Sequence, residues 1–198
     1  NGGGLTATGG EPLVQIDFLT ELFSQAKQRG IHTCLDTSGI MFRRNDPAVF
    51  AKFEKLSTVT DLVMLDIKHI DPEGHKKLTK QPNDNILDFA NYLAEKNIPV
   101  WIRHVIVPGI TDQEDELTRL GYFIGGLSNL KALDVLPYHT MGEVKYKNLG
   151  IDYPLKGVPA LTSNEAIIAK GHIIDGIKKR RKELAEENSQ NQTQTENS

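Results

Sequence analysis

The sequence predicts an α/β fold built on a parallel β-sheet. Two observations predict it: apolar runs rich in branched residues recur along the chain, and amphipathic helical patterns lie between them. Buried parallel strands have continuous apolar sequences, and strands that alternate with helices are joined by right-handed crossovers. Either an open doubly wound sheet or a full or partial barrel would satisfy this pattern.

The expected strands are the five apolar runs, at residues 5–8, 31–35, 62–65, 100–107 and 132–136. Apolar residues at helical spacing predict helices over residues 18–26, 49–56, 86–94 and 117–124. Asp112 is the expected N-cap of the fourth of these helices. Residues 140–161 are rich in Gly and Pro and are expected to form a long loop.

The C-terminal part of the chain has its own signals. The Thr162–Glu165 capping box opens a last helix that continues through Ile177. Residues 186–198 contain no apolar residue and are expected to be disordered, because such a composition cannot bury enough surface. We therefore expect one core over residues 1–185 and a polar tail over residues 186–198.

Composition limits the possible partners. The chain has 198 residues, 38% of them hydrophobic and 25% charged, and a formal net charge of −3. This balance argues against nucleic acid as a main partner, and no apolar run is long enough to span a membrane. The single cysteine cannot form an internal disulfide, which favours a reducing, cytoplasmic setting.

Polar or glycine-rich groups follow the expected strands, at the point where each strand ends. Ligands of parallel α/β folds bind at the carboxyl ends of the strands, so these groups predict a binding site at that edge. The groups that follow strands are Gly9-Gly10-Glu11, Asp36-Thr37, Asp66-Ile67-Lys68 and His139, and Arg103 lies inside the fourth apolar run.

The mixture of charges indicates the kind of ligand. Three carboxylates and two or three cationic groups suit a zwitterion that carries an ammonium and a carboxylate, whereas the carboxylates would repel a polyphosphate. Asp36 and Asp66 could share a hard cation with backbone oxygens, or could simply form a salt-bridge cluster with Lys68. The sequence leaves these two alternatives open.

Several motifs, in this order along the chain, resemble those of the radical S-adenosylmethionine enzymes, and among them the glycyl-radical activating enzymes. The resemblance covers about residues 2–158. The motifs are Gly3-Gly4-Leu5-Thr6-Ala7-Thr8-Gly9-Gly10-Glu11, Gly30-Ile31-His32-Thr33-Cys34-Leu35-Asp36-Thr37-Ser38-Gly39, Thr60-Asp61-Leu62-Val63-Met64-Leu65-Asp66-Ile67-Lys68, Val100-Trp101-Ile102-Arg103 and Leu136-Pro137-Tyr138-His139.

The resemblance implies a partial (β/α)₆ TIM-like radical-SAM barrel. It also implies that S-adenosylmethionine bound to a [4Fe–4S] cluster is cleaved by one electron, and that the resulting 5′-deoxyadenosyl radical takes a hydrogen from a glycine Cα. The implied protein substrate is a glycyl-radical enzyme, with pyruvate formate-lyase favoured, and the implied electron donor is a protein such as flavodoxin.

The resemblance also assigns roles to residues. Lys68 and Arg103 are the implied catalytic residues, and Arg103 would face the cofactor or the substrate glycine. The methionyl amino group would be held by Gly9, Gly10 and Glu11. The residues that would line the rest of the S-adenosylmethionine site are Asp66, Ile67, Lys68 and His139. The groups that would bind a monovalent cation are Asp36, Thr37, the carbonyl of Met64 and Asp66.

One departure from the family pattern is large. The family holds its cluster with three cysteines on a loop after the first strand, whereas this chain has only Cys34, which lies within an expected strand. We therefore expect the chain to be a fragment without the first βα unit, and to be inactive by itself. The alternatives are a non-catalytic barrel module that binds S-adenosylmethionine or a protein, and a barrel enzyme that uses Lys68 as a Schiff-base amine.

Overall fold

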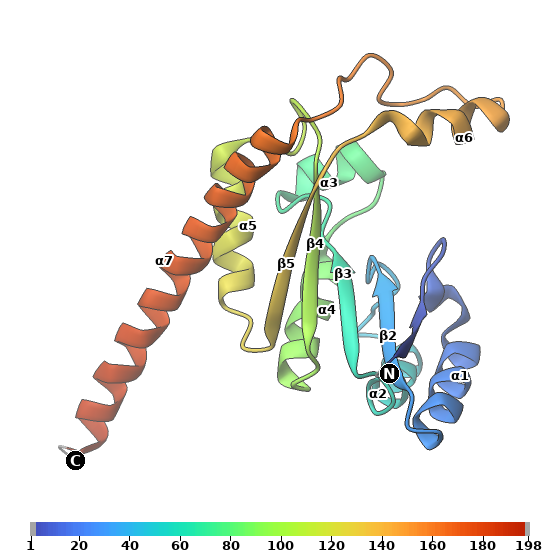
Figure 1. Ribbon diagram of the computed structural model, residues 1–198. Coiled ribbons are helices and arrows are strands. Elements are labelled where there is room, and N and C mark those ends of the chain that lie inside the picture. The colour runs from blue at the N-terminus through green and yellow to red at the C-terminus, as the bar shows by residue number, and fades with distance from the viewer. Residues whose placement is uncertain (1–2, 197–198) are drawn as a thin grey trace. The chain divides into compact units, whose positions relative to one another are not determined.

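A computed structural model describes residues 3–196, with side chains described through residue 190. These residues form a five-stranded sheet in the order β1-β2-β3-β4-β5 (Figure 1). The pairs β1–β2, β2–β3 and β3–β4 are parallel, so the predicted parallel α/β fold is confirmed. The strands are β1 (Gly4–Ala7), β2 (His32–Thr37), β3 (Leu62–Asp66), β4 (Val100–Ile106) and β5 (Leu130–Pro137).

Helices connect the strands. The α-helices are α1 (Ile16–Gln28), α2 (Pro47–Ser57), α3 (Pro72–Thr79), α4 (Asp84–Glu95), α5 (Glu114–Gly125), α6 (Glu143–Asn148) and α7 (Ser163–Glu196). Two short 3₁₀ helices, η1 (Pro12–Gln15) and η2 (Thr140–Gly142), complete the described elements. Among the described residues, no helix combines the length and the apolar character needed to cross a membrane.

Three local features differ from the sequence-based expectations. The N-cap of α5 is Gln113, because the carboxylate of Asp112 instead accepts a hydrogen bond from the backbone N–H of Gly109. Helix α3 has little apolar sequence and was not expected; Asp71 caps it by accepting from the backbone N–H of Gly74. The expected loop over 140–161 contains η2 and α6.

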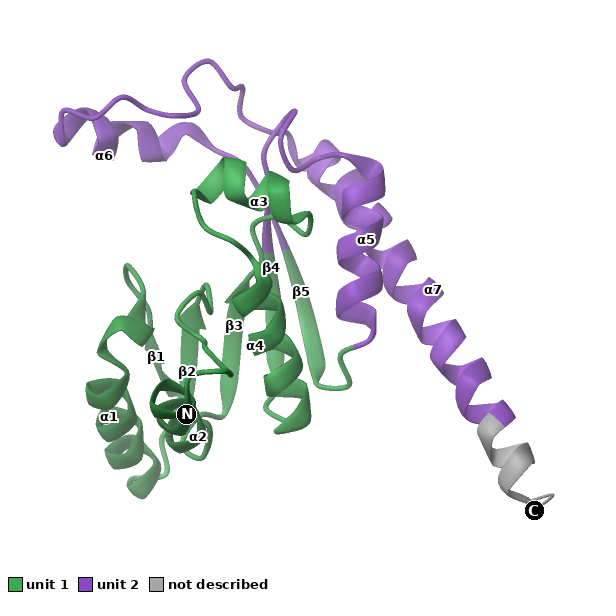
Figure 2. Cartoon of the chain, turned by 180° about the vertical axis from the view of Figure 1, so that it is seen from behind, with its two compact units in different colours: residues 1–103, 127–134 green, residues 104–126, 135–198 purple. Residues whose placement is uncertain are grey.

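The chain divides into two compact units (Figure 2). The first holds the residues up to 103 together with 127–134, and the second holds 104–126 and the residues from 135 onward. The expected division into a core over 1–185 and a tail over 186–198 stays a prediction. Helix α7 continues to Glu196, so the backbone of residues 186–196 is helical here rather than irregular, and residues 197 and 198 lie outside the described residues.

The core of the first unit lies on one face of its strands. Alternate strand residues such as Leu35, Leu65 and Ile102 are fully buried there, and α2 and α4 lie on the same side of the sheet (Figures 1 and 2). Phe42 forms edge and tilted ring contacts with neighbouring aromatic side chains, including Phe53. Such contacts give a rigid base beneath the strands.

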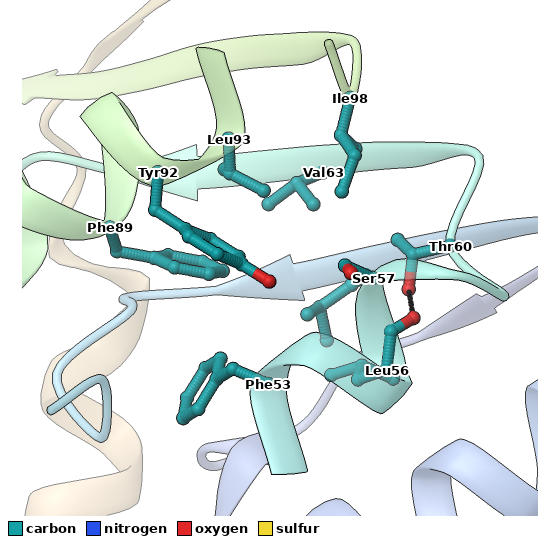
Figure 3. Close-up of a pocket in the computed structure, with 10 residues that line it drawn as sticks. Phe53, Leu56, Ser57, Thr60, Val63, Phe89, Tyr92, Leu93 and Ile98 are labelled. Carbon is teal, nitrogen blue, oxygen red and sulfur yellow. Dashed lines mark hydrogen bonds between the residues drawn. The ribbon is translucent and has the colours of Figure 1, made fainter. Parts of the chain in front are cut away.

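Figure 3 shows a small cavity in this core, of about 10 Å³. The hydroxyl of Tyr92 is buried there and has no hydrogen-bond partner among the described residues. A volume of this size holds about one water molecule, so the cavity is a packing gap rather than a ligand site. The lining residues are Leu35, Phe53, Leu56, Ser57, Thr60, Val63, Phe89, Tyr92, Leu93 and Ile98.

In the second unit, α5 and α7 pack at very short range. A Cβ atom placed on Gly121 would lie 1.9 Å from the carbonyl oxygen of Ile173, and one placed on Gly176 would lie 2.1 Å from the carbonyl oxygen of Thr118. The two backbones can approach this closely only because both positions lack a side chain. These glycines therefore set the spacing of the two helices.

Candidate functional site

The register of the first unit brings the polar strand-end residues together. Asp36 on β2 is the register partner of Met64 on β3, and Asp66 on β3 is the partner of Arg103 on β4. Residues two apart on one strand share a face of the sheet. Asp36, Asp66 and Arg103 therefore lie on one face, near the carboxyl ends of three neighbouring strands.

Asp36 is held from two sides. The Nη1 atom of Arg103 donates to both carboxylate oxygens of Asp36, at 3.2 and 3.0 Å. The hydroxyl of Thr8, just after β1, donates to Asp36 Oδ2 at 3.0 Å. The side chains of Arg103 and Asp36 are 30% and 20% exposed, so the charge-assisted contact is partly shielded from water.

Asp66 and Lys68 form a second ion pair. The ammonium of Lys68 donates to Asp66 Oδ2 at 2.6 Å. The other oxygen, Asp66 Oδ1, is buried and has no hydrogen-bond partner among the described residues. A buried carboxylate oxygen without a donor is costly, so this atom is available to a donor or cation supplied by a ligand. Ile67, between them, is fully buried.

The turn after β1 is open on its ligand side. Gly9 has φ +130, a conformation that favours glycine over residues with a side chain. A Cβ atom built on Gly10 would meet nothing within 4 Å. Backbone groups at Gly9 and Gly10 are therefore accessible to a ligand that approaches the strand ends.

Glu11 is fully engaged within the chain. Its Oε1 atom accepts from the backbone N–H of Leu13 at 3.1 Å and from the Thr37 hydroxyl at 2.5 Å. Its Oε2 atom accepts from the backbone N–H and the hydroxyl of Ser38, at 3.0 and 2.5 Å. The three contacts with Thr37 and Ser38 join the turn after β1 to the end of β2, and the contact with Leu13 caps η1.

A cavity of about 140 Å³ adjoins this group of residues. It is smaller than the 300–1,000 Å³ that enclose a typical small-molecule ligand, so it can take only part of one. Its lining residues are Ser38, Ile40, Lys68, His75, Thr79, Gln81 and Ile86.

His139 belongs to the second unit. It precedes η2, is exposed, and makes no capping hydrogen bond with its side chain. Its neighbour Tyr138 is buried and shares a hydrogen bond of 2.8 Å with the hydroxyl of Tyr153. That hydrogen bond raises the pKa of Tyr153 to about 12. The assignment of His139 to the ligand site stays a prediction.

Cys34 lies within β2 and is 6% exposed. Burial raises the pKa of its thiol, and the nearby charge of Asp36 acts in the same direction, against a hydrogen bond with Thr6. Within the described residues, no three His, Cys, Asp or Glu side chains are placed to hold a metal ion together. Cys34 therefore behaves as a core residue here.

Two hydroxyls have roles that the sequence does not predict. Thr8 fixes Asp36, and Ser38 supplies two of the four donors to Glu11. Both residues adjoin strand ends that the sequence marks as functional, which is the only signal they give. Their partners are 28 and 27 residues distant in the sequence, so only the folded chain reveals these contacts.

Comparison with known proteins gives sequence relatives for most of the chain. The chain is 53% identical over 160 residues to a pyruvate formate-lyase-activating enzyme of Listeria monocytogenes, an alignment that covers 81% of this chain and 64% of that enzyme. It is 52% identical over 168 residues to the enzyme of the same name from Streptococcus mutans, covering 85% of this chain and 64% of that enzyme. The chain thus spans about 64% of the length of these relatives.

A solved structure shares the fold. A domain of a pyruvate-formate lyase-activating enzyme from Bacteroides vulgatus matches with a TM-score of 0.70 and 23% sequence identity, over 88% of this chain and 95% of that domain. The α/β fold class and its partial-barrel architecture agree with this neighbour. The sequence profile described as the Radical SAM superfamily matches residues 2–121, which is more than half of the chain. The chain therefore belongs to the radical SAM superfamily.

Proposed function

We propose that this chain is part of an activating enzyme that installs a glycyl radical in pyruvate formate-lyase. The observation that carries the proposal is the identity of 53% over 160 residues with an enzyme of that name. The protein substrate would be the glycyl-radical enzyme, and the electron donor a protein such as flavodoxin. The reaction would take place in the cytoplasm.

Membership of the superfamily implies S-adenosylmethionine and a [4Fe–4S] cluster as cofactors. When bound and reduced, S-adenosylmethionine supplies the chemistry that removes a hydrogen atom from the substrate. The residues of this chain do not fit the cluster, because it needs several thiolates and the sequence has one cysteine. We propose that the cluster ligands belong to a part of the protein that this sequence does not include.

The residues do fit the methionyl part of S-adenosylmethionine. Its ammonium group requires acceptors, and Asp66 Oδ1 is a buried acceptor without a partner among the described residues. Backbone groups of Gly9 and Gly10 are open beside β2. Lys68 would bind a polar part of the ligand, while Ile67 and His139 would line the remainder of the site. Glu11 would lie at the same site, where it is bound to Thr37 and Ser38.

The same edge suits a monovalent cation. Asp36, Thr37, the carbonyl oxygen of Met64 and Asp66 lie on neighbouring strand ends of the first unit. Oxygen ligands of this type bind hard cations, and a cation would offset the repulsion between the two carboxylates and the carboxylate of the ligand. We propose that Arg103 shares Asp36 with this cation and faces the ligand or the substrate glycine.

The test is a radical assay on the intact protein under anaerobic conditions. The protein is mixed with S-adenosylmethionine, a strong reductant and pyruvate formate-lyase, and the glycyl radical is followed by electron paramagnetic resonance while 5′-deoxyadenosine is quantified. We expect both signals to grow together. An Asp66→Asn variant should lose both, whereas an Asp17→Asn variant, altered at an exposed carboxylate on α1, should retain them. Formation of 5′-deoxyadenosine with no radical in pyruvate formate-lyase would reject this substrate.

The 198-residue chain provides a second comparison. Reconstitution of this chain alone with iron and sulfide should give no stoichiometric cluster absorbance and no turnover of S-adenosylmethionine. A protein that contains the three-cysteine loop should give both. Turnover by the 198-residue chain alone would overturn the assignment of the cluster ligands.

Two other functions give different results in simple assays. A non-catalytic binding module would bind S-adenosylmethionine in the intact protein but form no 5′-deoxyadenosine. A Schiff-base enzyme would be trapped at Lys68 by borohydride in the presence of a carbonyl compound. The ion pair between Lys68 and Asp66 disfavours the Schiff-base function. Schiff-base lysines are activated by desolvation or by neighbouring cations, whereas the neighbour of Lys68 is a carboxylate.

A further inference from the structure

His75 on α3 carries a buried ring nitrogen without a hydrogen-bond partner. The residue is 2% exposed. Its Nδ1 atom lies 2.8 Å from the carbonyl oxygen of Gln81, whereas its Nε2 atom has no partner among the described residues. A buried polar atom that gives up its hydrogen bond to water costs free energy, so Nε2 marks a contact that the side chains alone do not complete.

The contact with Gln81 fixes which ring nitrogen carries the proton. A carbonyl oxygen only accepts hydrogen bonds, so Nδ1 is the donor. Burial lowers the pKa of His75, and the hydrogen bond with Gln81 opposes this effect. The positive charge of Lys68 also acts to lower this pKa. The ring is therefore neutral, and Nε2 presents a lone pair that requires a donor.

The cavity of about 140 Å³ described above provides room for that donor. His75 and Lys68 both line it, and Ser38 and Thr79 add hydroxyl groups to the lining. A buried water molecule is stable where about three polar groups bind it, and the polar part of this lining meets that requirement. Water therefore fits between the ammonium of Lys68 and Nε2 of His75.

The ammonium of Lys68 is only partly engaged. One of its N–H groups donates to Asp66 Oδ2 at 2.6 Å, and the others remain for further contacts. The side chain of Lys68 is 43% exposed, and a single ion pair at such exposure holds a long side chain weakly. A second hydrogen bond, from the side of the cavity, would fix the direction of the ammonium group.

We propose that His75 is a positioning residue for Lys68. Its Nε2 atom accepts a hydrogen bond from a water molecule in the cavity, and the same water accepts a hydrogen bond from the Lys68 ammonium. Lys68 is then held from two sides, by Asp66 directly and by His75 through water. The inference rests on the proposed function for the identity of the ligand that Lys68 binds, S-adenosylmethionine.

The first test is a crystal structure of the intact protein without S-adenosylmethionine, at a resolution that shows ordered water. We expect a water molecule within hydrogen-bonding distance of both His75 Nε2 and Lys68 Nζ. In a His75→Asn variant, this water should be lost and the Lys68 side chain should take more than one conformation. The proposal fails if no water joins the two groups in the wild type, or if Lys68 keeps one conformation in the variant.

The second test uses two substitutions that separate the two ring nitrogens. Asparagine keeps an amide near the position of Nδ1, beside Gln81, whereas glutamine places one near the position of Nε2. His75→Asn should weaken S-adenosylmethionine binding to the intact protein about tenfold, because a hydrogen bond that fixes a charged group is lost. His75→Gln should bind within about twofold of the wild type, although it loses the contact with Gln81 and melts at a lower temperature. Lys76→Gln, at the next and exposed position of α3, is the control and should match the wild type in both measurements.

A merely structural role for His75 predicts a different pattern. The affinity would then follow the melting temperature, and His75→Gln would bind as weakly as His75→Asn. That result would overturn the proposal, because only the substitution that restores an acceptor near Nε2 should restore binding.

A double-mutant cycle tests whether His75 acts through Lys68. In a Lys68→Met background, His75→Asn should weaken binding no further, within about twofold, because the lysine that the water would hold is already absent. Losses that multiply would show that His75 acts independently of Lys68, against the proposal. If the wild-type protein does not bind S-adenosylmethionine at all, the proposed function fails, and the two crystal structures still decide whether water from His75 holds Lys68.

Discussion

Arg103 on β4 reaches past β3 to donate from Nη1 to both carboxylate oxygens of Asp36 on β2. Arg103 is in register with Asp66, yet Asp66 is paired with Lys68. The candidate site thus contains two crossed ion pairs at the ends of three strands. Each carboxylate is fixed by a cation of the chain, which leaves Asp66 Oδ1 as the buried acceptor open to a ligand.

The first prediction concerns the cation site. Asp36→Asn should weaken S-adenosylmethionine binding about tenfold, because an amide attracts Arg103 and a cation much less than a carboxylate does. Binding should also become insensitive to the choice between sodium and potassium salts. Titration calorimetry in each salt measures both effects, with Asp17→Asn as the control. If Asp36→Asn and Asp66→Asn both keep the wild-type affinity and salt response, the two aspartates bind no cation and only form a salt-bridge cluster.

The second prediction separates folding from ligand approach at the glycine turn. Gly10→Ala should keep the melting temperature, because its new Cβ meets nothing within 4 Å, but should weaken S-adenosylmethionine binding by blocking the turn. Gly9→Ala should lower both the melting temperature and the affinity for S-adenosylmethionine, since φ +130 strains a residue with a side chain. Thermal melts and calorimetry on the two variants are the measurements. Wild-type affinity in Gly10→Ala would place the ligand elsewhere.

The third prediction concerns Asp61, which accepts from Lys27 and from the backbone N–H and hydroxyl of Thr33. Burial acts to raise the pKa of Asp61, but the hydrogen bonds from Lys27 and Thr33 outweigh it and hold the pKa below its usual value. A lowered pKa stabilises the fold above the unfolded-state pKa, and this contribution is lost as the pH falls through the folded-state pKa.

Asp61→Asn should therefore lower the free energy of unfolding at pH 7 by about 1–2 kcal/mol. The difference from wild type should shrink as the pH falls below about 4, the usual range for an aspartate in an unfolded chain. Urea denaturation at pH 7 and at pH 3.5 gives the two values. Asp17→Asn, which breaks an exposed ion pair with Lys52, should change stability little at either pH. An Asp61→Asn deficit that is independent of pH would contradict the assignment.

The fourth prediction concerns the packing of α5 against α7. Gly121→Ala should destabilise the protein by about 1–3 kcal/mol, because the added methyl group would overlap the carbonyl of Ile173 and force the helices apart. Gly171→Ala, on α7 in open space, should stabilise it by about 0.5–1 kcal/mol through helix propensity alone. Denaturant titration of both variants is sufficient. Equal effects of the two substitutions would show that the close approach does not hold in solution.

The fifth prediction concerns the polar end of the chain. Truncation after Ala185 should leave the melting temperature within about two degrees, because terminal residues without buried contacts contribute little. Residues 186–190 are exposed, and the contact of Glu187 with Arg180 is a surface ion pair. Differential scanning calorimetry of the truncated and intact chains is the measurement. A fall of many degrees would show that this segment docks.

The sequence predicts the strands well because a buried parallel strand needs a continuous apolar run, and this chain has five of them. It also predicts which residues stand at the strand ends, since Asp36 and Asp66 directly follow or close such runs. It does not predict α3, whose eight residues include only Leu78 as a large apolar side chain. Helix α3 depends on its Asp71 cap and its tertiary setting instead of on a hydrophobic stripe.

The sequence by itself determined the order of the strands and of the amphipathic helices between them, and the polar edge of the sheet, because periodicity and turn chemistry are local properties. The tertiary structure decided how the polar residues pair. Arg103 could have met Asp66, its register partner, but contacts Asp36, and Glu11 could have faced solvent but binds Thr37 and Ser38. Such choices depend on distances between residues that lie 26 to 67 positions apart in the chain, which only the packed strands bring within hydrogen-bonding range.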